Sequence, residues 1–282
     1  MQEVTCHKVG EQRIAQALGD IEGRAFSRWH RLRYDTLSLA GLQEMCDELL
    51  DHVAARALED PALADPARMV LRTAAECAYG VLDLGVFPHG DFEVVLPLVD
   101  MTLSSEDFDF GDAVDRIPTT RTWVDAFAMC LIGGLFREPS RVIAEMLRKD
   151  HAPELRTTEA ESAGLAEMDA LCGYLGTDPR PLRKPDAEER DLAARRLDAA
   201  GALTPDQRLL RVLLDDDQPA FEQALADRLV QHRESVGADP QPRSLLPVGT
   251  IALASLAVSA HGWQLGIRSG YIPCGLLRGP RQ

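Results

Sequence analysis

Hydrophobic positions recur at three- and four-residue steps along most of the chain, which is the period of an amphipathic helix. One hydrophobic stripe covers residues 39–53, and a second covers residues 70–81. Asp65 and Pro66 stand before the second stripe, and these residue types favour the N-cap and the first turn of a helix. The pattern therefore predicts an all-α protein.

Two pairs of residues in the second half of the chain have the form of a capping box. Asp186 is followed three residues later by Glu189, and Thr204 is followed in the same way by Gln207. In a capping box the first side chain accepts a hydrogen bond from the third helical residue, whose own side chain bonds back. Asp217 has the residue type of a further N-cap. Helices of this length with short turns predict a multi-helix array or bundle.

Two segments interrupt the helical pattern. Residues 86–118 form an irregular acidic insertion, in which residues 92–96 are the best candidate for a short strand that Pro97 would end. Residues 176–185 contain three prolines, which exclude a regular helix and indicate a linker or a long loop. This Pro-rich loop is locally basic, so pairing with the acidic insertion inside the molecule is an alternative use for both segments.

The length of 282 residues suits one large domain or two small ones. We predict a single α-helical domain over residues 1–282. The alternative is a division into residues 1–175 and 186–282, joined by the Pro-rich loop at 176–185. No repeat of fixed length is present, so the sequence does not predict a solenoid.

Charge separates the acidic insertion from the rest of the chain. Residues 86–115 hold eight acids and no Lys or Arg, in a chain whose net charge is −15. They also hold four of the eight Phe residues. Acids interleaved with aromatic rings suit a surface that binds a basic protein, because charge attracts the partner and buried rings hold it. The alternative is a solvated acidic loop whose rings pack into the core.

The acidic and aromatic side chains of this insertion are the candidate partner-binding residues. They are Asp91, Glu93, Glu106, Asp107, Phe108, Asp109, Phe110 and Asp112. The negative net charge argues against a general nucleic-acid binder, because such a protein needs a basic surface for the phosphate backbone. We therefore expect a protein partner and no nucleic acid.

Composition also bears on where the protein acts. Residues 244–267 hold no Asp, Glu, Lys or Arg, but Pro247 and Gly249 interrupt them, and their most apolar part is shorter than the roughly 20 residues of a membrane-spanning helix. We expect a buried core helix there and no membrane contact. The N-terminus has no apolar signal segment and the six Cys are scattered singly, so we expect a reduced, cytoplasmic protein.

The chain lacks the motifs that mark common catalytic and cofactor sites. It has no phosphate-binding loop, dinucleotide-binding glycine pattern, nucleophile elbow, His-Glu-x-x-His pair or Cys-x-x-Cys pair. Residues 106–112 do not have EF-hand spacing, and residues 215–217 are expected to cap helices and face solvent. His261, beside Trp263 on the apolar C-terminal helix, is expected to be a packed histidine with bonded nitrogens. We predict no enzyme, no metal and no cofactor, with an active site assembled from distant segments as the rival.

Several strings along the chain are similar to those of a known family. They are residues 28–35 (RWHRLRYD), 42–56 (LQEMCDELLDHVAAR), 70–78 (VLRTAAECA), 121–127 (RTWVDAF), 182–229 and 244–263. On these strings the chain resembles the actinobacterial immunity protein 49 family over nearly its whole length. The resemblance implies a mostly α-helical cytoplasmic protein that protects its producer by binding a polymorphic toxin. It implies no particular site residue, so the acidic aromatic surface is inferred from the residues alone.

The main functional hypothesis is an immunity protein that neutralises its cognate toxin by direct stoichiometric binding, with the acidic aromatic surface as the contact. A basic nuclease is one candidate toxin, because carboxylates can take places otherwise filled by phosphates. The first rival is a helical scaffold or regulatory module that binds a different protein, and the second is an enzyme with a dispersed active site. The sequence predicts no oligomeric state.

Overall fold

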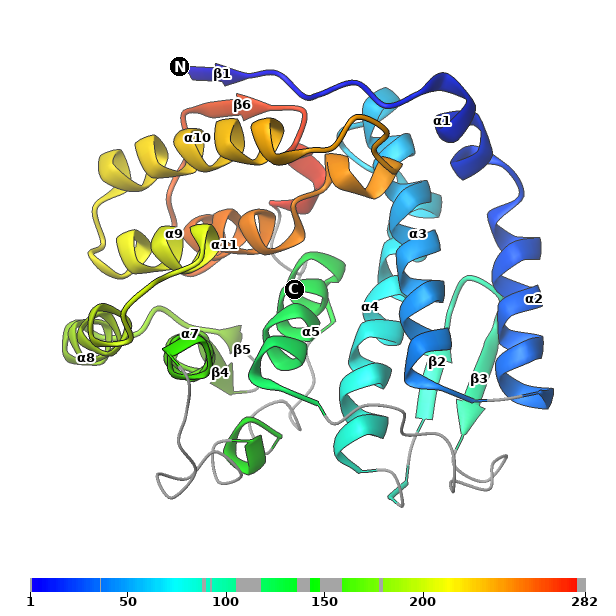
Figure 1. The fold of residues 1–282 in the computed structure, drawn as a ribbon, viewed down its shortest axis with the longest axis horizontal. Coiled ribbons are helices and arrows are strands. Elements are labelled where there is room, and N and C mark those ends of the chain that lie inside the picture. Colours follow the sequence, from blue (N-terminus) through cyan, green and yellow to red (C-terminus); the bar gives the residue numbers. More distant parts are fainter. Residues whose placement is uncertain are drawn as a thin grey trace.

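The computed structural model of the chain describes residues 2–35, 37–87, 90–91, 93–104, 118–135, 143–147, 159–177 and 180–277. Its α-helices are α1 (Glu11–Leu18), α2 (Ile21–Tyr34), α3 (Leu39–Glu59), α4 (Asp65–Val86), α5 (Thr120–Gly133), α7 (Glu159–Cys172), α8 (Ala187–Ala199), α9 (Pro205–Leu214), α10 (Gln218–Ser235) and α11 (Val248–Ser259). A short helical segment also covers residues 143–147. The strands are β1 (Gln2–Val4), β2 (Glu93–Leu96), β3 (Met101–Ser104), β4 (Leu175–Thr177), β5 (Arg180–Leu182) and β6 (Ile267–Ser269), and the 3-10 helices are η3 (Pro242–Leu245) and η4 (Cys274–Leu276). The prediction of a mostly helical fold is confirmed (Figure 1).

Helices α2, α3 and α4 form the N-terminal half of the fold, with α3 packed against both of its neighbours (Figure 1). The predicted stripe on α3 faces this core, where Leu42, Leu49 and Val53 are almost completely buried. Burial of each such side chain contributes about 2 kcal/mol of hydrophobic free energy, so the stripe accounts for the position of α3.

Helix α5 joins the two halves, because it packs against α4 on one side and α11 on the other (Figure 1). In the second half α11 also contacts α9 and α10, while α8 connects α7 to α9. Buried hydrophobic side chains from both sides of the Pro-rich loop belong to one continuous core. Folding as a single domain stays a prediction.

The acidic insertion contains a β-hairpin. β2 pairs with β3 in antiparallel register, with Glu93 opposite Ser104. The strand predicted at residues 92–96 is therefore found as β2, whereas β3 was missed because four residues give too little alternation. β2 lies close against α4, where a Cβ added to Gly80 would be 2.4 Å from a methyl carbon of Val94. The absence of a side chain at this glycine lets the hairpin approach the helix.

The Pro-rich loop, which was predicted to be a linker or a long loop, contains most of a second hairpin. β4 and β5 pair in antiparallel register, with Leu175 opposite Leu182 and Thr177 opposite Arg180. Pro181 has no N–H to donate, and a two-stranded hairpin tolerates it because each strand has an edge that needs no partner. The three prolines thus exclude a helix, as predicted, but they do not exclude a strand.

Two cations of the Pro-rich loop, Arg183 and Lys184, pair within the C-terminal half. The guanidinium group of Arg183 donates two hydrogen bonds to the Glu189 carboxylate, each of 2.6 Å. The ammonium nitrogen of Lys184 is 2.6 Å from a carboxylate oxygen of Asp216. Residues 105–117 of the acidic insertion lie outside the described part of the chain, so the alternative pairing with that insertion stays a prediction.

The predicted capping residues of the second half are found. Asp186 and Thr204 each form a capping box, at the start of α8 and of α9. Asp217 caps α10 by accepting a hydrogen bond of 3.1 Å from the backbone N–H of Ala220. Local sequence therefore sets where these three helices begin.

The start of α4 differs from its prediction by one residue. Asp65 is the first helical residue, and Ala64 stands at the N-cap. The chain before the helix is held by Asp60, whose carboxylate accepts hydrogen bonds from the backbone N–H groups of Ala62 and Ala64. These bonds fix the chain that leads into α4, which itself has no side-chain cap hydrogen bond.

The apolar stretch near the C-terminus is a buried helix, as predicted. Pro242–Ser259 is the one segment of the described chain that is long and apolar enough to cross a membrane, and 67% of it is buried inside the fold. Within it, α11 has 12 residues, with Ile251 and Leu256 fully buried. His261 follows α11 and does not lie on it, because the helix ends at Ser259.

Candidate partner-binding surfaces

Two of the predicted contact residues lie within the described part of the chain. Asp91 stands two residues before β2 and Glu93 is the first residue of that strand, and both residues are exposed. Asp100, in the turn between β2 and β3, is exposed as well. The other predicted contacts lie outside the described residues; they are Glu106, Asp107, Phe108, Asp109, Phe110 and Asp112.

The hairpin that carries these acids is fixed to two helices. The indole N–H of Trp29, on α2, donates a hydrogen bond of 2.8 Å to the backbone oxygen of Thr102, on β3. The hydroxyl of Thr73, on α4, accepts a hydrogen bond of 3.1 Å from the backbone N–H of Leu98. The described acids thus stand on a firm support, which reduces the conformational entropy lost when a partner binds.

A second surface, on the outer face of α2, was not predicted from the sequence. Phe26, His30 and Tyr34 follow one another at four-residue steps along this helix, and we call them the α2 ridge. Phe26 is 44% exposed and Tyr34 is 62% exposed. Both rings contact the buried Trp29, with ring centroids 5.3 Å from Phe26 and 6.1 Å from Tyr34. The four-residue spacing in the sequence indicates that the three rings share one face of the helix, but it does not show whether that face is exposed.

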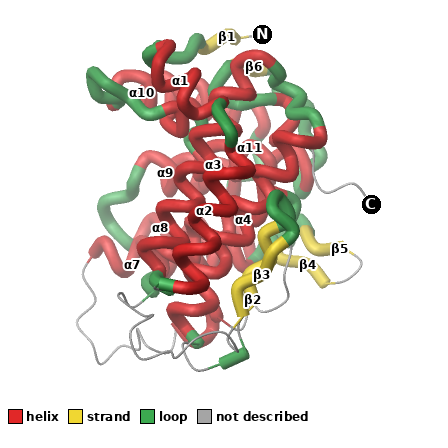
Figure 2. The backbone as a smooth tube through the Cα atoms, turned by 90° about the vertical axis from the view of Figure 1, so that its right-hand side faces the viewer, coloured by secondary structure: helices red, strands yellow, loops and turns green. Residues whose placement is uncertain are grey.

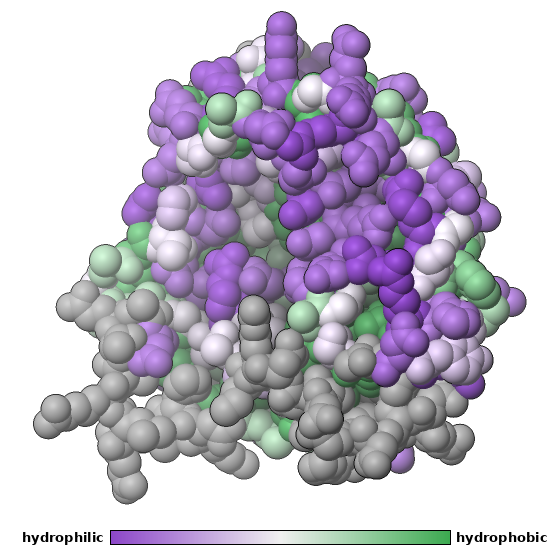
Figure 3. All heavy atoms as spheres, turned by 45° about the vertical axis from the view of Figure 1, so that its right-hand side comes forward, coloured by the Kyte–Doolittle hydropathy of each residue, from purple (hydrophilic) through white to green (hydrophobic). Residues whose placement is uncertain are grey.

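Figure 2 views the molecule from the side on which α2 lies, with the β2–β3 hairpin beside the helix. Figure 3 shows that the described surface on the adjacent side is mainly hydrophilic, with hydrophobic side chains in small patches. Against such a surface, a row of three exposed rings on one helix is a distinct feature.

Helix α2 is basic, although the chain as a whole is acidic. It holds four Arg and one Glu. Arg24 and Arg28 lie on the flank toward α3, where each pairs with Glu48, at 2.8 and 3.2 Å. Arg28 also pairs with Glu44, at 2.6 Å. These two arginines are therefore used to fasten α2 to α3.

The other two arginines accompany the ridge. The guanidinium carbon of Arg33 is 5.6 Å from the centroids of both the Trp29 and the Tyr34 rings, which is within the range of a cation–π contact. Arg31 is exposed one turn before Tyr34. The ridge thus combines aromatic rings with cationic charge at its border.

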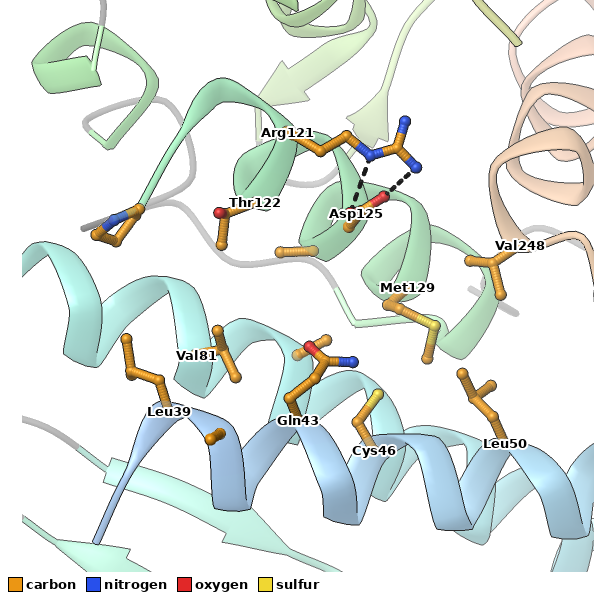
Figure 4. A pocket seen from close by; sticks show the side chains of 14 residues that line it. Leu39, Gln43, Cys46, Leu50, Val81, Arg121, Thr122, Asp125, Met129 and Val248 are labelled. Atoms are coloured by element: carbon orange, nitrogen blue, oxygen red, sulfur yellow. Dashed lines mark hydrogen bonds and ion pairs between the residues drawn. The ribbon is translucent and has the colours of Figure 1, made fainter. Parts of the chain in front are cut away.

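A groove runs between α3 and α5, over α4 (Figure 4). Its volume is about 360 Å³, in the range of small-ligand pockets. Its lining is mostly apolar, with Leu39, Cys46 and Leu50 from α3 and Ala126 and Met129 from α5. The groove can therefore receive an apolar group.

The polar side chains of the groove are poorly suited to catalysis. Arg121 and Asp125, one turn apart on α5, form an ion pair in which a guanidinium nitrogen is 2.8 Å from a carboxylate oxygen (Figure 4). Burial raises the pKa of the Cys46 thiol well above its ordinary value, so the thiol stays protonated and is a weak nucleophile. The described lining of the groove contains no histidine. We find no acid–base pair there that could activate a substrate.

A smaller cavity lies between α5, α7 and α11, lined in part by Arg121, Glu167 and Asp206. Burial raises the pKa of Glu167 to about 7, although a hydrogen bond of 2.8 Å from the side chain of Gln207 opposes this shift. The cavity volume is about 20 Å³, which is room for about one water molecule. Glu167 is a buried proton-binding group with no space for a substrate beside it.

A chain of hydrogen bonds in the second half links Tyr174, His261 and Asp216. His261 Nε2 is 2.9 Å from the Tyr174 hydroxyl, and His261 Nδ1 is 2.8 Å from Asp216 Oδ1. Burial lowers the pKa of His261 and raises the pKa of Tyr174 well above its ordinary value. The connectivity is that of a catalytic triad. Tyr174 is fully buried, however, so its hydroxyl cannot meet a substrate, and His261 is a packed histidine with bonded nitrogens, as predicted.

Asp216 differs from its prediction as a solvated acid at a helix end. Its carboxylate also lies 2.6 Å from Lys184 and 3.3 Å from Arg190. Partial burial acts to raise the pKa of Asp216, but hydrogen bonds from Lys184 and His261 outweigh it and hold the pKa below its ordinary value. These partners come from distant parts of the chain, so a pattern of three adjacent acids did not reveal them.

Within the described residues, no group of three or more His, Cys, Asp or Glu side chains has the geometry to hold a metal ion. Comparison with protein families gives a match to the model of immunity protein 49 over residues 60–276. The match does not include the similar strings at residues 28–35 and 42–56, so it covers most of the chain rather than nearly all of it. Searches of the curated proteins and of the solved structures each gave no match. On the extent of the family match, this chain belongs to the immunity protein 49 family.

Proposed function

We propose that this protein neutralises a cognate polymorphic toxin by direct, stoichiometric binding in the cytoplasm. Membership of the immunity protein 49 family carries the proposal, because an immunity protein implies a toxin from which it protects its producer. The exposed hairpin acids support it as well, since they are held in place before any partner arrives.

Three groups that have the chemistry to catalyse a reaction are poorly placed or poorly poised to do so, which favours binding without turnover. The Tyr174 hydroxyl at the end of the His261 chain is enclosed by the core, and the Cys46 thiol in the groove is protonated. Glu167 has room for about one water molecule beside it. A catalytic group must both reach a substrate and have a reactive protonation state, and none of these three groups meets both conditions.

The acidic hairpin is the proposed region of first contact. Its exposed carboxylates, Asp91 and Glu93, belong to the segment that holds eight acids and no base. Such a field attracts a basic protein over several ångströms of water and raises its association rate about 10- to 1,000-fold. A basic nuclease is the toxin class that this charge fits best, because its phosphate-binding site already accepts negative oxygens.

Co-expression with the toxin domain encoded nearest the gene tests the proposal. We expect the cells to survive and the two proteins to co-purify as a complex with a fixed ratio. An unrelated acidic helical protein at the same expression level is the control for non-specific protection. Cell death with both proteins folded would favour the rival, a helical scaffold or regulatory module with another partner. Survival without a complex would favour an enzymatic mode of protection.

A further inference from the structure

We infer that the α2 ridge is the centre of the toxin interface, and that the toxin presents to it an apolar pocket bordered by a carboxylate. The inference rests on the proposed function and deepens it, because it names the surface that holds the toxin and the chemistry of the toxin surface. α2 lies outside residues 60–276, so the ridge belongs to a part of the chain that the family match does not cover.

The exposure of the ridge is the first reason. Phe26 and Tyr34 are among the large hydrophobic side chains that are exposed in the described chain. Both lie on α2, with the exposed His30 between them. Other side chains of α2, including Ile21 and Trp29, are buried and make the contacts of the helix with the core. The ridge rings therefore add little to the packing of the fold, and their contact with water is unfavourable until a partner covers them.

The rigidity of the ridge is the second reason. The rings of Phe26 and Tyr34 both contact the buried Trp29 ring, and the centroid of the His30 ring is 4.7 Å from that of Tyr34. Rings that already contact one another lose little side-chain entropy when a partner packs over them. Trp, Tyr and Arg are also the residue types that most often supply the largest binding energies at protein interfaces, and the ridge combines Tyr34 with Arg33.

Charge identifies the chemistry of the partner. Arg31 is exposed at the border of the ridge that faces α3, beside Arg24 and Arg28, and forms no ion pair with another described residue. Trp29 joins α2 to β3, so the opposite border of the ridge lies toward the hairpin with Asp91 and Glu93. A complementary toxin surface therefore has an apolar centre, a carboxylate opposite Arg31 and basic side chains opposite the hairpin. This arrangement allows only one orientation of the toxin on the surface.

The inference is tested by calorimetric titration of the toxin domain encoded nearest the gene. It is titrated into the wild-type protein, two variants of the ridge and one variant of the arginine at its border. We expect Tyr34→Ala to raise Kd about 30-fold and Phe26→Ala about 10-fold. Arg31→Glu should raise Kd about 10-fold at low salt and less at high salt. Leu192→Ala is the matched control, because Leu192 is 43% exposed but lies on α8, on the opposite side of the fold from α2 (Figure 1). It should change Kd less than about twofold.

Far-UV circular dichroism and thermal unfolding show whether each variant is folded, and truncation of exposed rings should leave both unchanged. If the wild-type protein binds the toxin while Tyr34→Ala and Phe26→Ala bind within about twofold of it, the ridge assignment is overturned and the proposed function stands. If the folded wild-type protein neither binds the toxin nor protects cells, both are overturned. Light scattering tests whether a second copy of this chain occupies the ridge instead. A wild-type dimer that Tyr34→Ala converts to a monomer would assign the ridge to that second copy and overturn the inference.

Discussion

Replacing Trp29 by phenylalanine tests whether α2 and the acidic hairpin act as one rigid surface. Phenylalanine keeps an aromatic ring at this buried position but lacks the indole N–H that bonds to Thr102. The variant therefore removes the described hydrogen bond between α2 and β3 while leaving the exposed rings of the ridge in place. We expect a less stable protein whose hairpin opens more easily.

The size of the effect follows from two losses. The backbone oxygen of Thr102 loses its partner in a partly buried place, which destabilises the fold by about 1–3 kcal/mol. The smaller ring at position 29 also leaves space in a site that is only 6% exposed, for about 1 kcal/mol more. The sum is about 3 kcal/mol. With a urea m-value of about 3 kcal/mol/M, the unfolding midpoint should fall by about 1 M.

Urea unfolding followed by far-UV circular dichroism measures this change, and amide hydrogen exchange locates it. Exchange should accelerate more in β3 than in α9, which is distant from the substitution (Figure 1). Phe26→Leu is the control, because it alters an exposed ring without touching the hydrogen bond and should change stability by less than about 1 kcal/mol. A loss below about 0.5 kcal/mol in Trp29→Phe, or uniform exchange along the chain, would refute the coupling of helix and hairpin.

Two further predictions concern charge. Burial raises the pKa of Glu167 to about 7 from an ordinary value of 4.5, so its contribution to stability is complete below pH 4.5 and is lost as the pH rises through about 7. Relative to wild type, Glu167→Gln should gain about 3 kcal/mol in unfolding free energy between about pH 4.5 and 8; parallel pH profiles from urea unfolding would contradict this. The paired changes Asp91→Lys with Glu93→Lys, and Asp107→Lys with Asp109→Lys, should each slow toxin association about 10-fold at low salt and leave the fold intact. Stopped-flow rates at low and high salt measure this, and equal rates at low salt would remove the acidic surface from the account.

Much of the fold could be predicted because its determinants are close together in sequence. The side chains of Thr204 and Gln207 bond across three residues, so their pattern marks the start of α9 wherever the helix packs. The α3 stripe likewise predicts which face is buried, since Leu42 and Leu49 are on one side of any regular helix. Both predictions depend on local geometry alone.

Other features depend on residues that meet only in the folded chain. Asp216 was expected to face solvent, but folding brings Lys184 and His261 against its carboxylate. Strands β1 and β6 come from opposite ends of the chain and pair in parallel, with Gln2 opposite Ile267, and no pattern within either segment indicates the other. The hydrophobic periodicity of one segment carries no information about which distant segment will pack against it.

The candidate surfaces show the same division. The acidic insertion stood out by composition, which needs no structure, and its described acids, Asp91 and Glu93, are exposed. The α2 ridge did not stand out, because Phe26 and Tyr34 look like core residues until the burial of Trp29 shows which face of the helix is inward. Exposed aromatic rings can be told from buried ones only when the packing around the helix is known.

The central claim is that protection comes from a stoichiometric complex. The most direct measurement is titration of the purified toxin domain into the purified protein, with heat and complex mass recorded together. We expect saturation at a fixed whole-number ratio, with a Kd on the order of 1 nM or below, and loss of toxin activity in proportion to the complex formed. Loss of toxin activity at ratios far below one protein per toxin, or protection of cells without any complex in the titration, would contradict it.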